Sequence, residues 1–114
     1  MPIKKATRYC FLTSLLFFIL SCSNDDKNYS KSYLRGKRIY QSSCTACHNS
    51  NPSKVGILAP NIEDSDSLTI ESMILHGKPP KGQNPKWDHV DMNPLPYLIE
   101  EVPFLFEYIN SFRK

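Results

Sequence analysis

The 114-residue sequence lacks an apolar run long enough to cross a bilayer, and it lacks an excess of either charge once its first residues are set aside. The longest apolar stretch, residues 11–20, spans about 15 Å as a helix, roughly half of a hydrocarbon core. Lys4, Lys5 and Arg8 lie in the first 21 residues, so the remaining 11 Lys and Arg balance 11 Asp and Glu. We therefore expect neither a permanent membrane helix nor nucleic-acid binding.

Several patterns of folds and of enzymes are also missing. The sequence shows no alternation of apolar and polar residues of useful length, no internal repeat and no low-complexity tract. It has no Ser/His/Asp set, no paired carboxylates suited to acid–base catalysis and no glycine-rich phosphate loop. These absences argue against a sheet-based fold, and we expect a protein that is not an enzyme.

The N-terminus has the layout of an export signal. Basic residues precede the short apolar stretch, and Ser21 and Cys22 follow it. The segment that ends at Cys22 resembles the bacterial lipobox, which implies a signal peptide over 1–21 and a lipid on Cys22. Residues 22–30 are then a lipidated N-terminus with a flexible polar tether. We expect a membrane-anchored lipoprotein of the bacterial envelope with its domain in the periplasm, and the choice of membrane and leaflet stays open.

The remaining chain, residues 31–114, predicts one small all-α domain. Apolar residues recur at helical spacing over 32–47, 68–77 and 105–112, with Ser30 or Ser32 available to cap the first of these helices. Residues 49–64 are rich in Pro, Asn and Ser and predict an ordered loop. Residues 78–96 hold five prolines and predict a second long loop. Pro103 fits only the first turn of the last helix.

The strongest chemical signal is the pentapeptide that contains Cys44, Cys47 and His48. Its C-x-x-C-H spacing lets two thiols add to the two vinyl groups of one haem while the next imidazole reaches the iron. A thioredoxin-like redox pair would need a βαβ context, and a zinc site would have to recruit His76 or His89. Cys10 falls in the signal and Cys22 is assigned to the lipid, so no thiol is left over. We predict one covalent haem c, around which a small core and long loops can pack.

The sixth iron position has several candidates. Met92 is preferred because it lies in a proline-bounded loop from which a thioether can approach the face opposite His48. His89 is the main alternative, and two further candidates lie on the middle helix. Pro60 is placed so that a nearby carbonyl could accept the ring N–H of His48. Trp87 could donate its N–H to a haem propionate, although core packing explains it nearly as well. The candidates on the middle helix are Met73 and His76.

These motifs together resemble the small single-haem bacterial cytochromes c of the class I type over about residues 31–113. The resemblance rests on C-x-x-C-H, on Ala59-Pro60-Asn61, on Trp87 followed by Met92, and on Gly36 and Tyr40 in the first helix with Leu105 and Tyr108 in the last. It implies three main helices with long loops wrapped around one haem. It also implies that Gly36 is small so that the last helix can approach closely.

The resemblance implies single-electron transfer between redox proteins of the envelope. The expected partners are a quinol-oxidising complex on one side and a terminal oxidase or reductase on the other, with the protein itself a monomer. An alternative is a haem-based gas sensor or a small peroxidase, each of which needs a labile or vacant sixth position.

Overall fold

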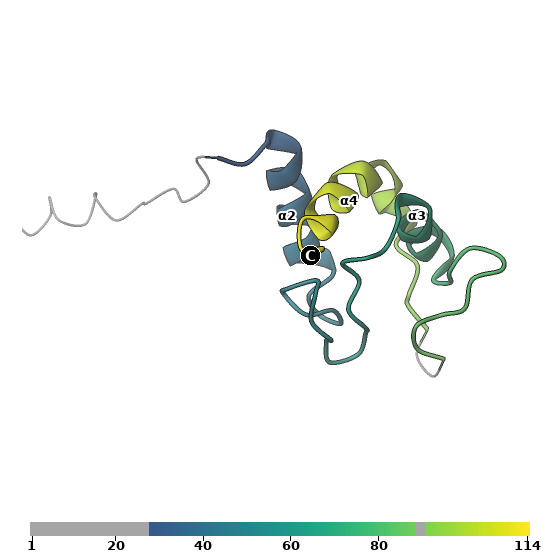
Figure 1. The fold of residues 1–114 in the computed structure, drawn as a ribbon. Coiled ribbons are helices and arrows are strands. Elements are labelled where there is room, and N and C mark those ends of the chain that lie inside the picture. Colours follow the sequence, from purple (N-terminus) through teal and green to yellow (C-terminus); the bar gives the residue numbers. More distant parts are fainter. Residues whose placement is uncertain (1–27, 89–90) are drawn as a thin grey trace, which may run out of the picture.

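A computed structural model describes residues 28–88 and 91–114. The described residues contain no strand, so the all-α prediction is confirmed. The segment 1–21, Cys22 and His89 lie outside the described residues, and what was expected of them stays a prediction. The elements, shown in Figure 1, are α2 (Lys31–Ser43), α3 (Ser67–His76), the 3-10 helix η1 (Pro96–Glu101) and α4 (Val102–Asn110).

Helix α2 begins where predicted and ends before the predicted boundary. Ser30 is its N-cap, and the side chain accepts a hydrogen bond of 3.0 Å from the Tyr33 amide. The expected helix over 32–47 was too long, because helical geometry stops at Ser43. Beyond that point the Thr45 hydroxyl donates to the Gln41 carbonyl at 2.8 Å, which satisfies an acceptor that a longer helix would have paired with a backbone amide.

Helix α3 agrees with its predicted start and stop. The Asp66 side chain caps it by accepting from the Thr69 amide at 2.7 Å. Gly77 ends it in the left-handed conformation, with φ of 68°. Ile70 and Ile74 are the buried residues of this helix and face the core.

The entry into the last helix differs from the expectation. Residues 96–101 were not predicted to be helical, yet they form η1, with Pro96 at its N-terminus, where a missing N–H costs nothing. Helix α4 follows directly and carries Pro103 in its first turn, as predicted. Leu98 of η1 is buried, so this extra turn adds to the core.

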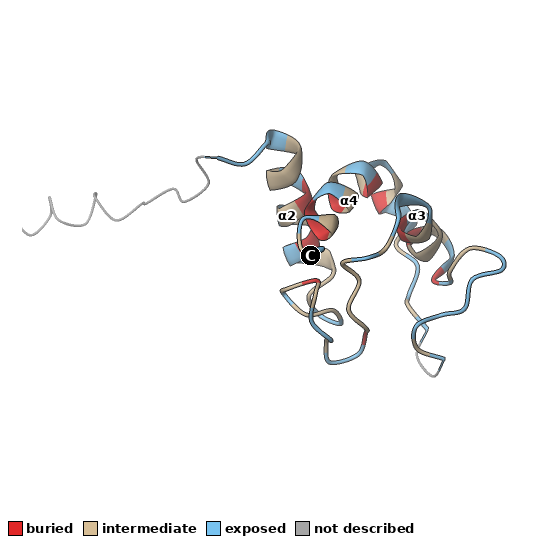
Figure 2. Ribbon diagram, in the orientation of Figure 1, coloured by how far each residue is buried: buried red, intermediate tan, exposed pale blue. Residues whose placement is uncertain are grey.

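Helices α2 and α4 pack closely against each other and hold most of the core. Tyr40, Leu105 and Tyr108 are almost fully buried. Figure 2 shows red, buried segments on both α2 and α4. The approach depends on Gly36: a Cβ atom there would lie 2.0 Å from the backbone oxygen of Phe104. The two long loops leave this helical layer on the same side (Figure 1).

Candidate haem attachment site

The two cysteines lie at the C-terminal end of α2. Cys44 is the C-cap residue, is partly buried and packs against the core, whereas Cys47 is exposed. A tight turn follows, in which the amides of Cys47 and His48 both point to the Cys44 carbonyl, at 3.3 and 2.9 Å. Both cysteines are free thiols, and burial, followed by the neighbouring Cys47, raises the pKa of Cys44 to about 11. The turn therefore presents two neighbouring thiols, the more buried of which stays protonated near neutral pH.

The imidazole of His48 is fixed by the following loop. Its Nδ1 lies 3.1 Å from the Pro60 carbonyl oxygen, which can accept only from the Nδ1–H tautomer. That tautomer leaves the lone pair of the neutral ring on Nε2, the form required of a metal ligand. Burial lowers the pKa of His48, opposed by the hydrogen bond to Pro60, so the neutral ring is favoured.

The loop that carries Pro60 is folded back onto the cysteine turn. The Leu58 amide donates to the Cys47 carbonyl at 3.2 Å, and the Gly56 amide donates to the Ala59 carbonyl at 2.8 Å. A Cβ atom at Gly56 would lie 2.3 Å from the Cys47 carbonyl oxygen, so only glycine allows this approach. The sequence reasoning missed Gly56, because a close tertiary approach leaves no periodic signal.

Met92 belongs to the other long loop and is held at the C-terminal end of α3. Its side chain is partly buried and packs against the core cluster that Cys44 also contacts. A Cβ atom at Gly77 would lie 2.0 Å from the Met92 carbonyl oxygen, and the Leu95 amide donates to the Ile74 carbonyl at 2.7 Å. Gly77 therefore ends α3 and also provides the space for the backbone of Met92, a second role that the sequence did not reveal.

Trp87 is partly buried and lies on the same loop, five residues before Met92. Its proposed hydrogen bond to a propionate stays a prediction. Of the other sixth-ligand candidates, His76 is exposed on α3 and Met73 is partly buried. Lys86, next to Trp87, donates a hydrogen bond to the loop that carries Pro60, a contact that sequence reasoning missed.

The donor set fits a haem c. Two adjacent thiols, an imidazole held in its Nδ1–H tautomer and a thioether on a separate loop are the groups that such a cofactor needs. Cys44 and Met92 pack against the same core cluster, so each loop brings a sulfur-containing side chain to that cluster. The described residues include no group of three or more His, Cys, Asp or Glu that could hold a metal ion.

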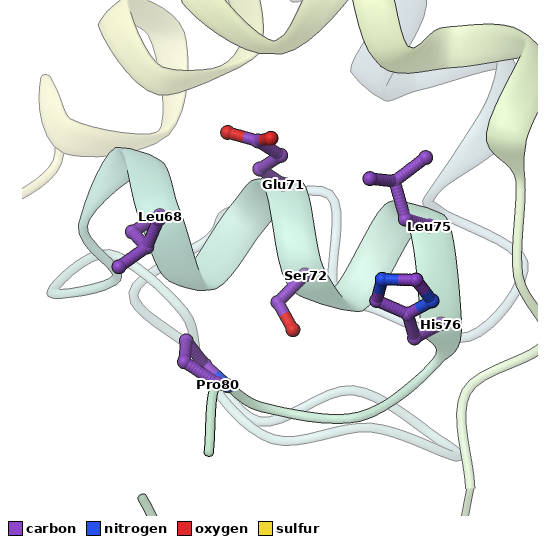
Figure 3. A pocket seen from close by; sticks show the side chains of 6 residues that line it. All are labelled: Leu68, Glu71, Ser72, Leu75, His76 and Pro80. Carbon is purple, nitrogen blue, oxygen red and sulfur yellow. The ribbon is translucent and has the colours of Figure 1, made fainter.

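A separate pocket lies along the outer side of α3, shown in Figure 3. It is open and mostly apolar, and it contains none of the cysteines, His48 or Met92. It is therefore distinct from the haem attachment site. Its lining residues are Leu68, Glu71, Ser72, Leu75, His76 and Pro80.

Comparison with known proteins gives one family. The family model for cytochrome c oxidase, cbb3-type, subunit III matches residues 31–95, which is more than half of the chain. The match includes both cysteines, His48, Pro60 and Met92, and it stops before η1. No curated protein and no solved structure matches the chain. Within the part of the chain that the structure describes, none of the helices has the length and apolar character of a membrane span.

Proposed function

The chain belongs to the family of cbb3-type cytochrome c oxidase subunit III, a family of haem c proteins of the bacterial envelope, and we propose that it is a single-electron carrier with one haem. The observation that carries the proposal is the contact of 3.1 Å between His48 Nδ1 and the Pro60 carbonyl beside the C-x-x-C pair. This contact prepares Nε2 for a metal at the place where two thiols can hold a porphyrin.

Each site residue has a distinct part in this proposal. Cys44 and Cys47 would hold the haem through thioether bonds, each thiol adding its sulfur to one vinyl carbon and its hydrogen to the other. His48 and Met92 would ligate the iron, and Trp87 would donate to a propionate. The haem, when bound, supplies an iron that cycles between two oxidation states.

Two filled axial positions suit electron transfer better than catalysis. With His48 and Met92 both on the iron, a small molecule has no open coordination position. A His/Met pair also raises the reduction potential, which suits an acceptor from a quinol-oxidising complex and a donor to a terminal oxidase or reductase. The family name supports a partner of the oxidase type.

The N-terminal segment determines where the carrier works. We propose cleavage after Ser21, a lipid on Cys22 and a polar tether over 22–30 that joins the lipid to the haem domain. The domain then lies in the periplasm as a membrane-anchored monomer. The basic and apolar parts of the segment 1–21 support this proposal.

Absorption spectra of residues 23–114, produced in a host that attaches haem c, test the ligands. We expect a low-spin reduced spectrum, and in the oxidised protein a weak far-red band from sulfur-to-iron charge transfer. Met92→Ala should abolish that band. Met73→Ala is the matched control, because it removes a thioether from α3 and should keep the band.

Other outcomes of the same measurement would redirect the proposal. A low-spin spectrum without the far-red band would indicate that a histidine is the sixth ligand, and His89 would be the first candidate. A high-spin spectrum would favour the gas sensor or the peroxidase over the electron carrier. A chain without covalent haem would overturn the proposed function as a whole.

A further inference from the structure

Lys86 joins the two loops that carry the proposed iron ligands. Its Nζ donates to the Asn61 carbonyl at 2.8 Å and to Asp64 Oδ1 at 2.5 Å. Asn61 directly follows Pro60, whose carbonyl contacts His48, and Lys86 lies on the loop that leads to Met92. We call the contacts of Lys86 with Asn61 and Asp64 the interloop bridge.

The Asp64 end of the interloop bridge is attached to the end of α4 and to the residues that follow it. Arg113 Nη2 donates to the Asp64 backbone carbonyl at 2.7 Å, and Asn110 Nδ2 donates to the neighbouring Ser65 carbonyl at 2.8 Å. Lys86 therefore binds to a segment that is itself fixed to the helical layer. A loop tied to such a point loses part of its freedom to move away from the other loop.

The interloop bridge is a charged contact at the surface. The hydrogen bond from Lys86 holds the pKa of the Asp64 carboxyl below its usual range, so Asp64 is charged near neutral pH. The two side chains are 39% and 58% exposed, and an exposed ion pair adds little to global stability. Its effect is larger on local opening, because a proline-rich loop without helix or strand has few regular hydrogen bonds to break.

We propose that Lys86 is a positioning residue that holds the Met92 loop against the Pro60 loop and so limits how often Met92 leaves the iron. This inference rests on the proposed function. The interloop bridge is then a tertiary contact that controls how easily an external ligand reaches the sixth coordination position. An intact bridge favours a closed site and electron transfer, whereas a broken bridge admits an external ligand more often.

The test compares Lys86→Met with Lys81→Met in the haem-loaded full chain. Lys81 is an exposed lysine of the same loop, so both variants remove one positive charge from it. Imidazole is the probe, because it binds ferric iron only after Met92 has left. We expect Lys86→Met to raise the association rate of imidazole about fivefold, the upper end for loss of one exposed ion pair. Lys81→Met should stay within about twofold of the wild type.

Two further variants separate a specific bridge from a general loss of stability. Lys86→Arg keeps a cationic donor and should restore most of the wild-type rate. Asp64→Asn removes the carboxylate but keeps the Asn61 contact, so its rate should lie between those of the wild type and Lys86→Met. Hydrogen exchange of peptides covering 59–65 and 80–88 should become faster in Lys86→Met and not in Lys81→Met.

Equal imidazole rates in Lys86→Met and Lys81→Met, with unchanged hydrogen exchange, would overturn the inference and leave the electron carrier intact. A wild-type ferric protein without the far-red band would instead overturn Met92 ligation, and with it the control of ligand exchange. In that case hydrogen exchange alone decides whether the interloop bridge holds the two loops together. The failure of the bridge and the failure of the proposed function are therefore distinguishable.

Discussion

The helical layer and the two loops beside it are stabilised by different interactions. In the layer, Tyr40, Leu105 and Tyr108 are 0 to 3% exposed and pack in the apolar core, where the rings of Tyr40 and Tyr108 are in contact. In the loops, residues 44–66 and 77–95, the described residues are mostly exposed or only partly buried, as the ribbon colours of Figure 2 show. Hydrogen bonds of backbone and side chains, together with close backbone approaches, hold the loops instead.

This difference separates folding from function. The α2 and α4 contact has its own buried core, whereas the loops expose Val55, Ile57 and Leu58, the second of which is 89% exposed. We expect the haem to supply the apolar surface that the loops lack, so the loops gain more order from the cofactor than the helices do. Changes in the layer should act on stability, and changes in the loops on the iron ligands.

The largest expected effect comes from the closest approach in the helical layer. Gly36→Ala would put a Cβ atom 2.0 Å from the Phe104 oxygen and 3.0 Å from the Tyr108 Cβ. The helices must then separate, and we expect the free energy of unfolding of the haem-loaded protein to fall by about 2 to 3 kcal/mol in urea titration. This loss remains after the gain of up to about 1 kcal/mol that alanine brings to a helix interior.

The control for Gly36→Ala is Ser42→Ala, an exposed position on the same helix, which should stay within about 0.5 kcal/mol of the wild type. The far-red band should persist in any folded Gly36→Ala protein, since the loops are not changed directly. Wild-type stability for Gly36→Ala would show that the α2 and α4 contact is looser than the structure indicates.

At the end of α3, Gly77→Ala should lower stability less than Gly36→Ala does, but it should disturb the ligation of the iron more. Gly77→Ala places a side chain where φ is 68° and where its Cβ would meet the Met92 oxygen at 2.0 Å. We expect a loss of about 1 to 2 kcal/mol from backbone strain, together with a weakened far-red band as Met92 is displaced.

Gly82→Ala is the matched control on the same loop. Its φ is 91°, so alanine is strained there too, but its Cβ would meet nothing within 4 Å. It should therefore lower stability and leave the far-red band unchanged. If the two glycine variants kept the band equally well, the position of Met92 would not depend on the end of α3.

The smallest expected effect concerns the exposed cap of α3. Hydrogen bonds from Thr69 lower the pKa of Asp66 below its ordinary value of 3.8. A lowered pKa stabilises the fold above pH 3.8, and this contribution is lost as the pH falls through the folded value. Asp66→Asn keeps a cap without a charge, so the wild type should have the higher urea midpoint at pH 7. The difference should close as the pH falls below 3.8 and through the lowered pKa of folded Asp66. A difference that stays constant over this range would exclude ionised Asp66 as its source.

Local signals in the sequence predicted much of the helical layer. Asp66 and Gly77 are a helix start and a helix stop that act through their own neighbours, and the helix between them was predicted over 68–77. The end of α2 was misplaced, because the Thr45 hydroxyl competes for a helical acceptor, which apolar spacing does not report. The turn η1 was missed, because a short 3-10 helix beside prolines lacks the 3.6-residue period.

The sequence alone determined the helical class of this protein and the chemistry of its cofactor, because C-x-x-C-H and apolar spacing both act over a few neighbouring residues. Only the tertiary structure decided which groups support that chemistry. The Met92 carbonyl packs against Gly77, and Lys86 reaches Asp64 across 22 residues of chain. Such contacts depend on how separate elements are placed in space, and a residue's neighbours in sequence do not encode them.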